Sequence, residues 1–308
     1  FGEIAQRHLA NLIELYPNYE YAVLSKSKIK KKKLISFVSL KKAIKFQPFL
    51  TLICSPANTH VKYAELFSKI NSHLFIEKPV ALNIIELKKL FKIIKYKKKL
   101  IMSGYNLRYD DSLIFFKNKI RKNIIGNILS VRSEVGQYLP NWRKKDYSKT
   151  VSAQKKLGGG VINELSHDVD ILYMLFDDIK IIFGLNYKVS NLKINTEDTV
   201  HAVFKSKYKS DAFYITLNMD FYRHDTTRKC LIIGSKATLE WDGVNKNVKI
   251  FKKGKNINTY QFDKSTNSSY INQINYLFKN IYKKKTLLKS FKINLKLVKT
   301  LALLRKKI

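Results

Sequence analysis

Cysteine, proline, arginine and acidic residues are all scarce in this sequence, and each scarcity narrows the possibilities. The chain of 308 residues has five prolines and two cysteines, Cys54 and Cys230. The cysteines lie far apart without metal-ligand spacing, so the sequence predicts neither a disulfide framework nor a metal site. A reducing cytoplasm is the compartment we expect. No stretch approaches the roughly 20 consecutive apolar residues that span a bilayer, and no signal-peptide pattern opens the chain. We therefore expect no membrane partner.

Acidic side chains are few, and this sets the charge of the chain. Asp and Glu number 23 against 59 Lys and Arg, which gives a formal net charge of +36 and a pI near 10.0. Such an excess is typical of proteins that bind nucleic acids. Only eight of the basic residues are arginine, however, and the lysines are scattered along the chain. Because arginine is the usual bidentate reader of bases and phosphates, we expect no specific nucleic-acid partner. An acidic substrate stays open.

The order of apolar segments indicates two domains. From 1 to 104, short apolar runs alternate with amphipathic segments, which predicts a doubly wound parallel sheet with right-handed crossovers. From 105 onward a helix, a strand at 128–135 and several antiparallel strands between 179 and 262 are indicated. The predicted fold class is therefore α/β, with domains 1–104 and 105–308. The closing amphipathic helices can pack back on the first domain.

A sharp turn follows the most apolar of the predicted strands. The run Leu74–Ile76 reads as a buried parallel strand, and Glu77, Lys78 and Pro79 follow it at once. Pro79 forces a turn, so Lys78 is expected at the carboxyl end of the sheet, where α/β proteins bind ligands. A lysine beside apolar walls can exchange protons near neutrality. The alternative is a surface lysine that ends a strand.

The first residues resemble half of a dinucleotide-binding fingerprint. Gly2 and Ala5 match the second and third small positions of G-x-G-x-x-G/A, at the start of a helix that contains Ile4. Such a helix start can hold a pyrophosphate; the alternative is a plain glycine-started helix. The first glycine and the strand before it are absent, so we expect the sequence to be a fragment whose first β-strand is missing.

Two further predicted strand ends carry polar residues. Ser25 and Lys26 stand where an NAD-preferring site places an acid for the ribose hydroxyls, and their donors would suit a 2′-phosphate. The cofactor predicted is NAD or NADP, with a mild preference for NADP. Ser55, Asn58 and His60 follow the strand 49–53. The alternatives are a solvated lysine loop and a structural histidine.

Two later segments add candidate groups. A long loop, 136–156, carries Tyr138, Trp142 and Arg143, which can stack on sugars and bind phosphates; an ordinary aromatic-anchored loop is the alternative. Three glycines, 158–160, then lead into a predicted helix on which Glu164 and His167 share a face. A carboxylate that orients an imidazole is a recurring acid–base arrangement, and a capping Glu beside a structural His is the alternative.

These motifs together resemble the Gfo/Idh/MocA oxidoreductases, the family of glucose–fructose oxidoreductase and inositol dehydrogenase. The features that carry the resemblance are Gly2–x–x–Ala5–x–Arg7–His8, Ser55–Pro56–x–Asn58–x–His60, Glu77–Lys78–Pro79, Gly104–Tyr105–Asn106–x–Arg108–Tyr109, the glycine-rich helix with His167, and Gly234–x–x–Ala237–Thr238–Leu239–x–Trp241–Asp242. They occur in order along nearly the whole chain.

The resemblance implies a Rossmann domain followed by an α/β domain with an open, mostly antiparallel sheet. It implies an NAD(P) cofactor, a homodimer or homotetramer, and Lys78 near nicotinamide and substrate, with a Lys–Pro bond that is often cis. His167 would be the acid–base partner. The expected cofactor-binding residues are Gly2, Ile4, Ala5, Ser25, Lys26, Ser55, Asn58, His60, Glu77, Lys78 and Arg108. The expected substrate contacts are Asn106, Tyr138, Trp142, Arg143, Asn163, Glu164 and His167.

One departure from the family concerns the acid that accompanies the histidine. The family often has Asp four residues before it, whereas here Asn163 is four before and Glu164 is three before. We therefore assign the catalytic role to Lys78 and His167.

The predicted function is an NAD(P)-dependent oxidoreductase acting on the CH–OH group of a sugar or nucleotide sugar, in surface-glycan biosynthesis. The alternatives are a non-catalytic nucleotide-binding or scaffold protein of this fold and a basic nucleic-acid-associated protein.

Overall fold

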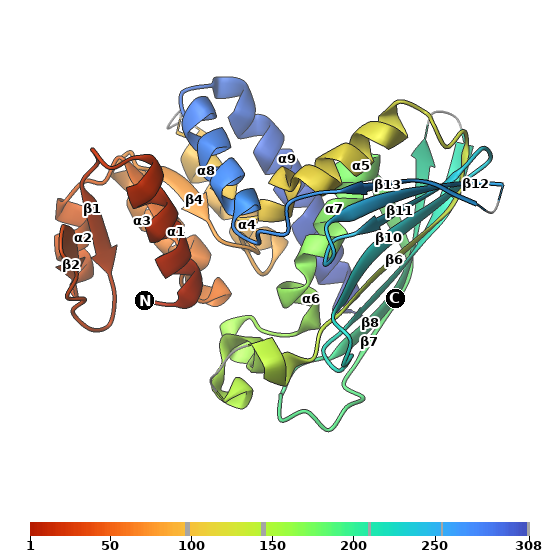
Figure 1. Cartoon of the computed structure of the whole chain (residues 1–308). Helices are drawn as coiled ribbons and strands as arrows, with labels where there is room; N and C mark the ends of the chain where they lie inside the picture. The colour runs from red at the N-terminus through yellow and green to blue at the C-terminus, as the bar shows by residue number, and fades with distance from the viewer. Residues whose placement is uncertain (96–98, 143–145, 209–210, 254, 307–308) are drawn as a thin grey trace. The chain divides into compact units, whose positions relative to one another are not determined.

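The computed structural model describes residues 1–95, 99–142, 146–208, 211–253 and 255–306. The chain divides into two units (Figure 1): Phe1–Gly104 with Tyr270–Leu295, and Tyr105–Ser269 with Lys296–Ile308. Helix α9 (Lys284–Leu304) contributes to both.

The first unit alternates helices and strands. Its elements are α1 (Glu3–Leu15), β1 (Tyr21–Leu24), β2 (Leu34–Phe37), α2 (Leu40–Lys45), β3 (Leu50–Ile53), α3 (His60–Lys69), β4 (His73–Ile76), α4 (Ile84–Lys95), β5 (Ile101–Ser103) and α8 (Ser268–Asn280). Side chains set several of the helix starts. Asn83, for example, accepts a hydrogen bond from the backbone N–H of Glu86 at 2.9 Å, a typical N-cap contact.

The strands of this unit are all parallel, which confirms the α/β class. They form two ladders, β1–β2 and β3–β4–β5. Strand β4 is buried at every position because β3 and β5 flank it and α3 packs on it. Its apolar run is therefore the continuous kind that a covered parallel strand requires. The short β2 and α2 had no counterpart among the predicted elements.

The second unit is built on one eight-stranded sheet. Its helices are α5 (Asp111–Arg121), α6 (Val161–Glu164), α7 (Ser166–Phe176) and the end of α9, and its strands are β6 (Ile128–Gly136), β7 (Ile179–Tyr187), β8 (Thr199–Tyr208), β9 (Asp211–Asp220), β10 (Thr227–Gly234), β11 (Thr238–Asp242), β12 (Asn247–Lys252) and β13 (Lys255–Gln261). The strand order is β13-β12-β11-β10-β6-β9-β8-β7. Only the β6–β9 pairing is parallel among these, so the predicted open, mostly antiparallel sheet is confirmed.

Helices cover one face of this sheet (Figure 1). Helix α5 packs on β11 and β12, and α7 packs on β6, β7 and β8. Leu172, Phe204 and Leu239 are among the fully buried side chains of the core. On β9 exposed and buried positions alternate, and Tyr214 of β9 and Arg132 of β6 are exposed on the other face.

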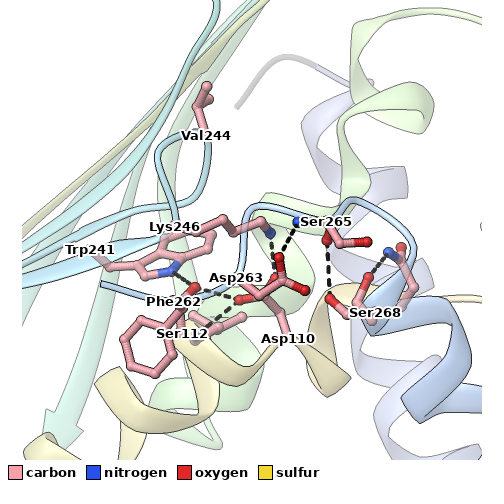
Figure 2. A network of polar contacts seen from close by, with 12 residues as sticks. Asp110, Ser112, Trp241, Val244, Lys246, Phe262, Asp263, Ser265 and Ser268 are labelled. Atoms are coloured by element: carbon pink, nitrogen blue, oxygen red, sulfur yellow. Dashed lines mark hydrogen bonds and ion pairs between the residues drawn. The ribbon is translucent and has the colours of Figure 1, made fainter. Parts of the chain in front are cut away.

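A buried polar network fixes the start of α5 (Figure 2). Asp110 caps the helix by accepting from the backbone N–H of Leu113 at 3.1 Å, and it also accepts from the Ser112 hydroxyl and from the Lys246 ammonium. Trp241 Nε1 donates to Ser112 Oγ at 2.8 Å. An ion pair this deeply buried needs all of these hydrogen bonds to offset its desolvation. It ties the segment after β5 to the β11–β12 turn.

Among the residues described by the structure, no helix has both the length and the apolar character needed to cross a membrane.

Candidate active site

The amino-terminal end of α1 begins at a glycine. Gly2 is the N-cap residue, and this position makes no side-chain cap hydrogen bond. A Cβ built on Gly2 would find no heavy atom within 4 Å, so the space in front of the helix is open. Ile4 and Ala5 in the first turn are half-buried. A 13-residue helix that begins this way fits an anionic group such as a pyrophosphate.

The end of β1 is polar and carries no carboxylate. Ser25 donates its backbone N–H to Phe37 O at 3.0 Å, and its hydroxyl contacts Ser27 O. Lys26 is exposed. These residues can donate to a ligand but cannot accept from the hydroxyls of a ribose in the way a carboxylate does.

The end of β3 is held by a buried histidine. His60 is 1% exposed, and its ring nitrogens lie 2.7 Å from Ser55 O and 2.8 Å from Pro79 O. Burial lowers the pKa of the His60 ring, although both carbonyls favour its protonated form. His60 therefore joins the loop after β3 to the turn after β4. Asn58 stays exposed in the 3-10 turn Ala57–Thr59.

The end of β4 carries the predicted catalytic lysine. Lys78 is half-buried, and the Lys78–Pro79 bond is cis. Glu77, by contrast, is buried, and its carboxyl group lies 2.6 Å from His8 Nε2. His8 received no role from the sequence, although it stood in one of the quoted motifs. Burial also raises the pKa of the neighbouring Cys54 thiol, with Glu77 as a second cause, so this thiol is a poor nucleophile.

Arg108, predicted to bind cofactor, lies in the second unit in a bidentate ion pair. Its Nε and Nη2 donate to the two carboxylate oxygens of Asp170 on α7 at 2.7 and 2.6 Å. The pKa of Arg108 is raised by Asp170 against the effect of its own burial, and burial raises the pKa of Asp170. Asp168 makes a second such pair with Arg228 of β10, at 3.2 Å for both contacts. The two ion pairs hold α7 in place, and neither was predicted from the sequence.

The glycine-rich stretch is shaped by close packing. Gly158 and Gly160 have φ of 84° and 101°, which glycine adopts readily. A Cβ on Gly159 would lie 2.1 Å from Val151 O. The Asn163 amide donates to Gly158 O at 2.9 Å and accepts from Arg305, so this predicted substrate contact has protein partners on both of its polar atoms.

The predicted helix after these glycines is two helices. It breaks at Leu165, where ψ is 17°, and Ser166 Oγ donates to Asn163 O at 2.8 Å across the break. Glu164 therefore ends α6 while His167 lies in the first turn of α7, so the prediction of a single helix is wrong. A serine hydroxyl that bonds to the backbone competes with helix continuation at this point.

His167 is half-buried against an aromatic ring. The Tyr105 ring meets it edge-on with centroids 5.4 Å apart, and the Tyr105 hydroxyl donates to Ser166 Oγ at 3.3 Å. Asn106, next along the chain, donates to Ser269 Oγ at 2.8 Å and is buried. Tyr105 thus packs beside the predicted acid–base residue, while the amide of Asn106 is engaged within the second unit.

The aromatic loop is a series of 3-10 turns, Leu139–Trp142, Tyr147–Lys149, Val151–Ala153 and Lys155–Leu157. The Tyr138 ring lies on His224 at 4.5 Å between centroids, and Trp142 meets Phe221 edge-on at 5.2 Å. Within the described part of the chain, Trp142 Nε1 is buried without a hydrogen-bond partner. Arg143 lies outside the described residues.

Two protein-family models match the chain, each over a different part of it. Residues 1–105 match the GFO_IDH_MocA family model, described as an oxidoreductase family with an NAD-binding Rossmann fold. Residues 117–291 match the model of the same family's C-terminal alpha/beta domain. The two matches together cover most of the chain.

Individual relatives are distant. The myo-inositol 2-dehydrogenase of Thermotoga maritima is 22% identical over 239 residues, or 75% of this chain and 68% of that protein. The levoglucosan dehydrogenase of Pseudarthrobacter phenanthrenivorans is 28% identical over 134 residues, or 42% of this chain and 33% of that protein. A solved structure of levoglucosan dehydrogenase with NADH and levoglucosan has a TM-score of 0.81 at 14% identity, covering 99% of this chain and 94% of that one. This last likeness shows the fold.

Proposed function

The chain belongs to the Gfo/Idh/MocA oxidoreductase family, and from this premise we propose that it is an NAD(P)-dependent dehydrogenase of a sugar or polyol. The observation that carries the proposal is the set of groups at the carboxyl ends of the parallel strands. Ser25 follows β1, Ser55 follows β3 and Lys78 follows β4, in the same unit as the glycine-capped amino terminus of α1. Doubly wound sheets bind dinucleotides at this edge.

The residues present fit a dinucleotide. The open space at Gly2 and the glycine-capped start of α1 suit a pyrophosphate, and the loops after β1 and β3 supply hydroxyl and amide donors. The residues that would hold it are Gly2, Ile4, Ala5, Ser25, Lys26, Ser55, Asn58 and Lys78. When bound, the nicotinamide supplies the acceptor or donor of a hydride at C4.

Lys78 has the chemistry to handle the proton of the reacting hydroxyl. Oxidation of an alcohol removes a hydride from carbon and a proton from oxygen, so the oxygen gains negative charge as the reaction proceeds. The neutral amine of Lys78 takes up the proton, and the ammonium that results stabilises the negative charge on the oxygen. His167 is the second proposed acid–base group, since an imidazole exchanges protons near neutral pH.

The finer cofactor preference rests on the end of β1. Ser25 and Lys26 supply donors there, and the sequence has no Asp or Glu from residue 21 to residue 33. Donors of this kind suit a 2′-phosphate, whereas a carboxylate suits free ribose hydroxyls. We propose NADP as the preferred cofactor. Lys26→Asp should weaken the binding of NADP relative to that of NAD, measured as the ratio of the two Kd values. A ratio equal to that of the wild type would contradict the proposed preference for NADP.

The finer substrate class rests on the aromatic loop. Tyr138 and Trp142 offer flat apolar faces, and a sugar ring packs its C–H face on such side chains. The relatives named above are dehydrogenases of inositol and levoglucosan, which supports a cyclic polyol or sugar. We propose a nucleotide-linked sugar as the natural substrate, because the excess of lysine favours an anionic compound.

A homo-oligomer is also proposed. The outward face of the eight-stranded sheet exposes Phe183 and Tyr214, on strands β7 and β9. Exposed aromatic side chains on a sheet face are typical of interfaces. Light scattering of the purified protein should give a dimer or tetramer, and Tyr214→Glu should weaken it. A monomer at all concentrations would contradict this proposal.

The function is tested by following nicotinamide reduction spectrophotometrically with NAD and NADP. The substrates are myo-inositol, levoglucosan and UDP-linked sugars. Lys78→Ala or His167→Ala should lower kcat by about 10²-fold or more, the range expected for an acid–base group. Lys62→Ala, an exposed lysine on α3, is the matched control. Rates near wild type in Lys78→Ala would reject the assignment of Lys78.

A further inference from the structure

The turn that carries Lys78 is held by a carboxyl group directed into the protein. Glu77 follows the buried strand β4, and its backbone N–H donates to Ile53 O at 2.9 Å, which continues the ladder to β3. Its side chain turns back, and Oε2 accepts the backbone N–H of Lys78 at 3.1 Å. The glutamate therefore fixes the backbone of the very next residue.

A histidine from another element holds the second oxygen of this carboxyl group. His8 lies on α1, is 1% exposed, and places Nε2 at 2.6 Å from Glu77 Oε1. When the Glu77 carboxyl group is ionised, its oxygens can only accept, and Nε2 is then the donor. The imidazole also makes edge-type contacts with the rings of Phe75 and Tyr270, at 5.0 and 5.7 Å between ring centroids. Ring packing therefore adds to the hydrogen bond in fixing its position.

A glycine makes the room for this arrangement. Gly104 follows β5, and its backbone N–H donates to Ile76 O at 2.8 Å. A Cβ on Gly104 would lie 2.7 Å from Glu77 Oε2 and 2.8 Å from Glu77 Cδ. Side chains do not approach this closely, so any larger residue at 104 would displace the carboxyl group.

The other end of the turn is held in the same way. His60 contacts Pro79 O at 2.8 Å, as described above, so two buried imidazoles flank Lys78 along the chain. Both histidines belong to the first unit. A lysine has a long flexible stem, and holding its backbone at both ends reduces the directions in which its ammonium can point.

We propose that His8 and Glu77 form a buried positioning pair for Lys78. In this proposal Glu77 holds the backbone of Lys78 and does not bind the cofactor, which differs from the role expected from the sequence. The role in catalysis rests on the proposed function, whereas the effect on the position of Lys78 does not. His8→Phe removes the donor and keeps a ring, and His8→Gln restores a donor. Gly104→Ala displaces the carboxyl group of Glu77 without changing the residue at position 8 or 77.

The first experiment measures the position of Lys78 directly. Folded protein is trace-labelled with acetic anhydride, and the labelling rate of Lys78 is read by mass spectrometry relative to exposed Lys62. Trypsin does not cut the Lys78–Pro79 bond, so the peptide Ile70–Lys88 reports Lys78 as its one internal lysine. The rate should change severalfold in His8→Phe and Gly104→Ala and return toward wild type in His8→Gln.

A buried histidine on β4, the strand that precedes Glu77, serves as the control. His73, four residues before Glu77, is also buried, and its Nδ1 accepts from Leu100 N at 3.0 Å. The shorter His73→Asn should leave the Lys78 labelling rate unchanged. An unchanged Lys78 rate in Gly104→Ala, or in a folded His8→Phe, would overturn the proposal. Should His8→Phe fail to fold, Gly104→Ala and His8→Gln still decide.

The second experiment separates this proposal from the proposed function. If wild-type protein reduces NAD or NADP with a polyol, His8→Phe should lower kcat by about 10²-fold, the cost of misplacing a reacting group by about 1 Å, while KM for the cofactor stays near wild type. A wild-type kcat in His8→Phe would refute the positioning role. Absence of turnover with every substrate in the wild type would reject the function, and the labelling result would still decide whether the pair positions Lys78.

Discussion

Breaking the ion pair between Arg108 and Asp170 tests whether Arg108 has a structural role. The Asp170 side chain is 2% exposed and the Arg108 side chain 21%, and both contacts of the fork are 2.7 Å or shorter. Removing one partner of a buried pair leaves the other charge unpaired, which costs about 3–5 kcal/mol. We place Arg108→Met at about 3 kcal/mol, the lower end, because water reaches part of the site.

The double variant gives the sharper test. Arg108→Met with Asp170→Leu replaces both charges by apolar side chains, a change that is often neutral or better. The double variant should therefore be more stable than Arg108→Met alone. Burial raises the pKa of Asp170, so this pKa is higher in the folded protein than in the unfolded chain. The ionisation of Asp170 therefore lowers the stability of the folded protein as pH rises. The deficit of Arg108→Met should therefore be smaller at pH 5 than at pH 8.

Urea unfolding followed by tryptophan fluorescence measures the stability of the second unit, which contains the ion pair. The chain has two tryptophans, Trp142 and Trp241, and both lie in the unit that contains Arg108 and Asp170. The exposed pair Arg223–Asp225 is the control, and Asp225→Asn should leave the urea midpoint unchanged. If Arg108→Met is equally silent but weakens NADH binding tenfold or more, the reasoning fails and the predicted cofactor role of Arg108 stands.

The remaining predictions concern His73, Gly159 and Lys246. Burial, with a contribution from Lys99, lowers the pKa of His73 to about 4, so the stability of the first unit should fall as pH drops from about 6.5 toward 4; circular dichroism should show this loss reduced in His73→Asn. Gly159→Ala forces a Cβ to 2.1 Å from a backbone oxygen and should destabilise the second unit by about 3 kcal/mol in the fluorescence assay, whereas Gly184→Ala, whose nearest neighbours are methyl groups at 3.1 Å, should cost less. Lys246→Met leaves Asp110 buried without its cation and should cost about 3–5 kcal/mol; an unfolding midpoint equal to wild type would show that the network in Figure 2 contributes nothing.

Much of the fold is local in origin and could be predicted from the sequence. The continuous apolar run of β4 and the proline after it indicate a covered parallel strand followed by a turn, because these signals act within a few residues. Asn83 at the start of α4 is a similar local signal. Short elements such as β2 and α2 lacked a clear period and had no counterpart in the prediction.

Helix continuity was harder to predict. The apolar positions of 161–176 have helical spacing, yet the chain breaks at Leu165. Periodicity reports which side chains face the core, and two short helices in succession can give the same pattern as one long helix. A side-chain hydrogen bond of Ser166 spans the break, and spacing does not encode it.

The sequence by itself determined which residue types stand at the ends of the parallel strands and which family they resemble. It could not determine where their side chains point. Glu77 and Arg108 were both expected at a cofactor, and the structure directs one toward His8 and the other toward Asp170, partners 69 and 62 residues away in the chain. Such pairings arise only when packing brings distant elements together, because a buried charge has to find its partner wherever the fold places one. The tertiary structure alone therefore decided which of the candidate residues support the site from within the protein.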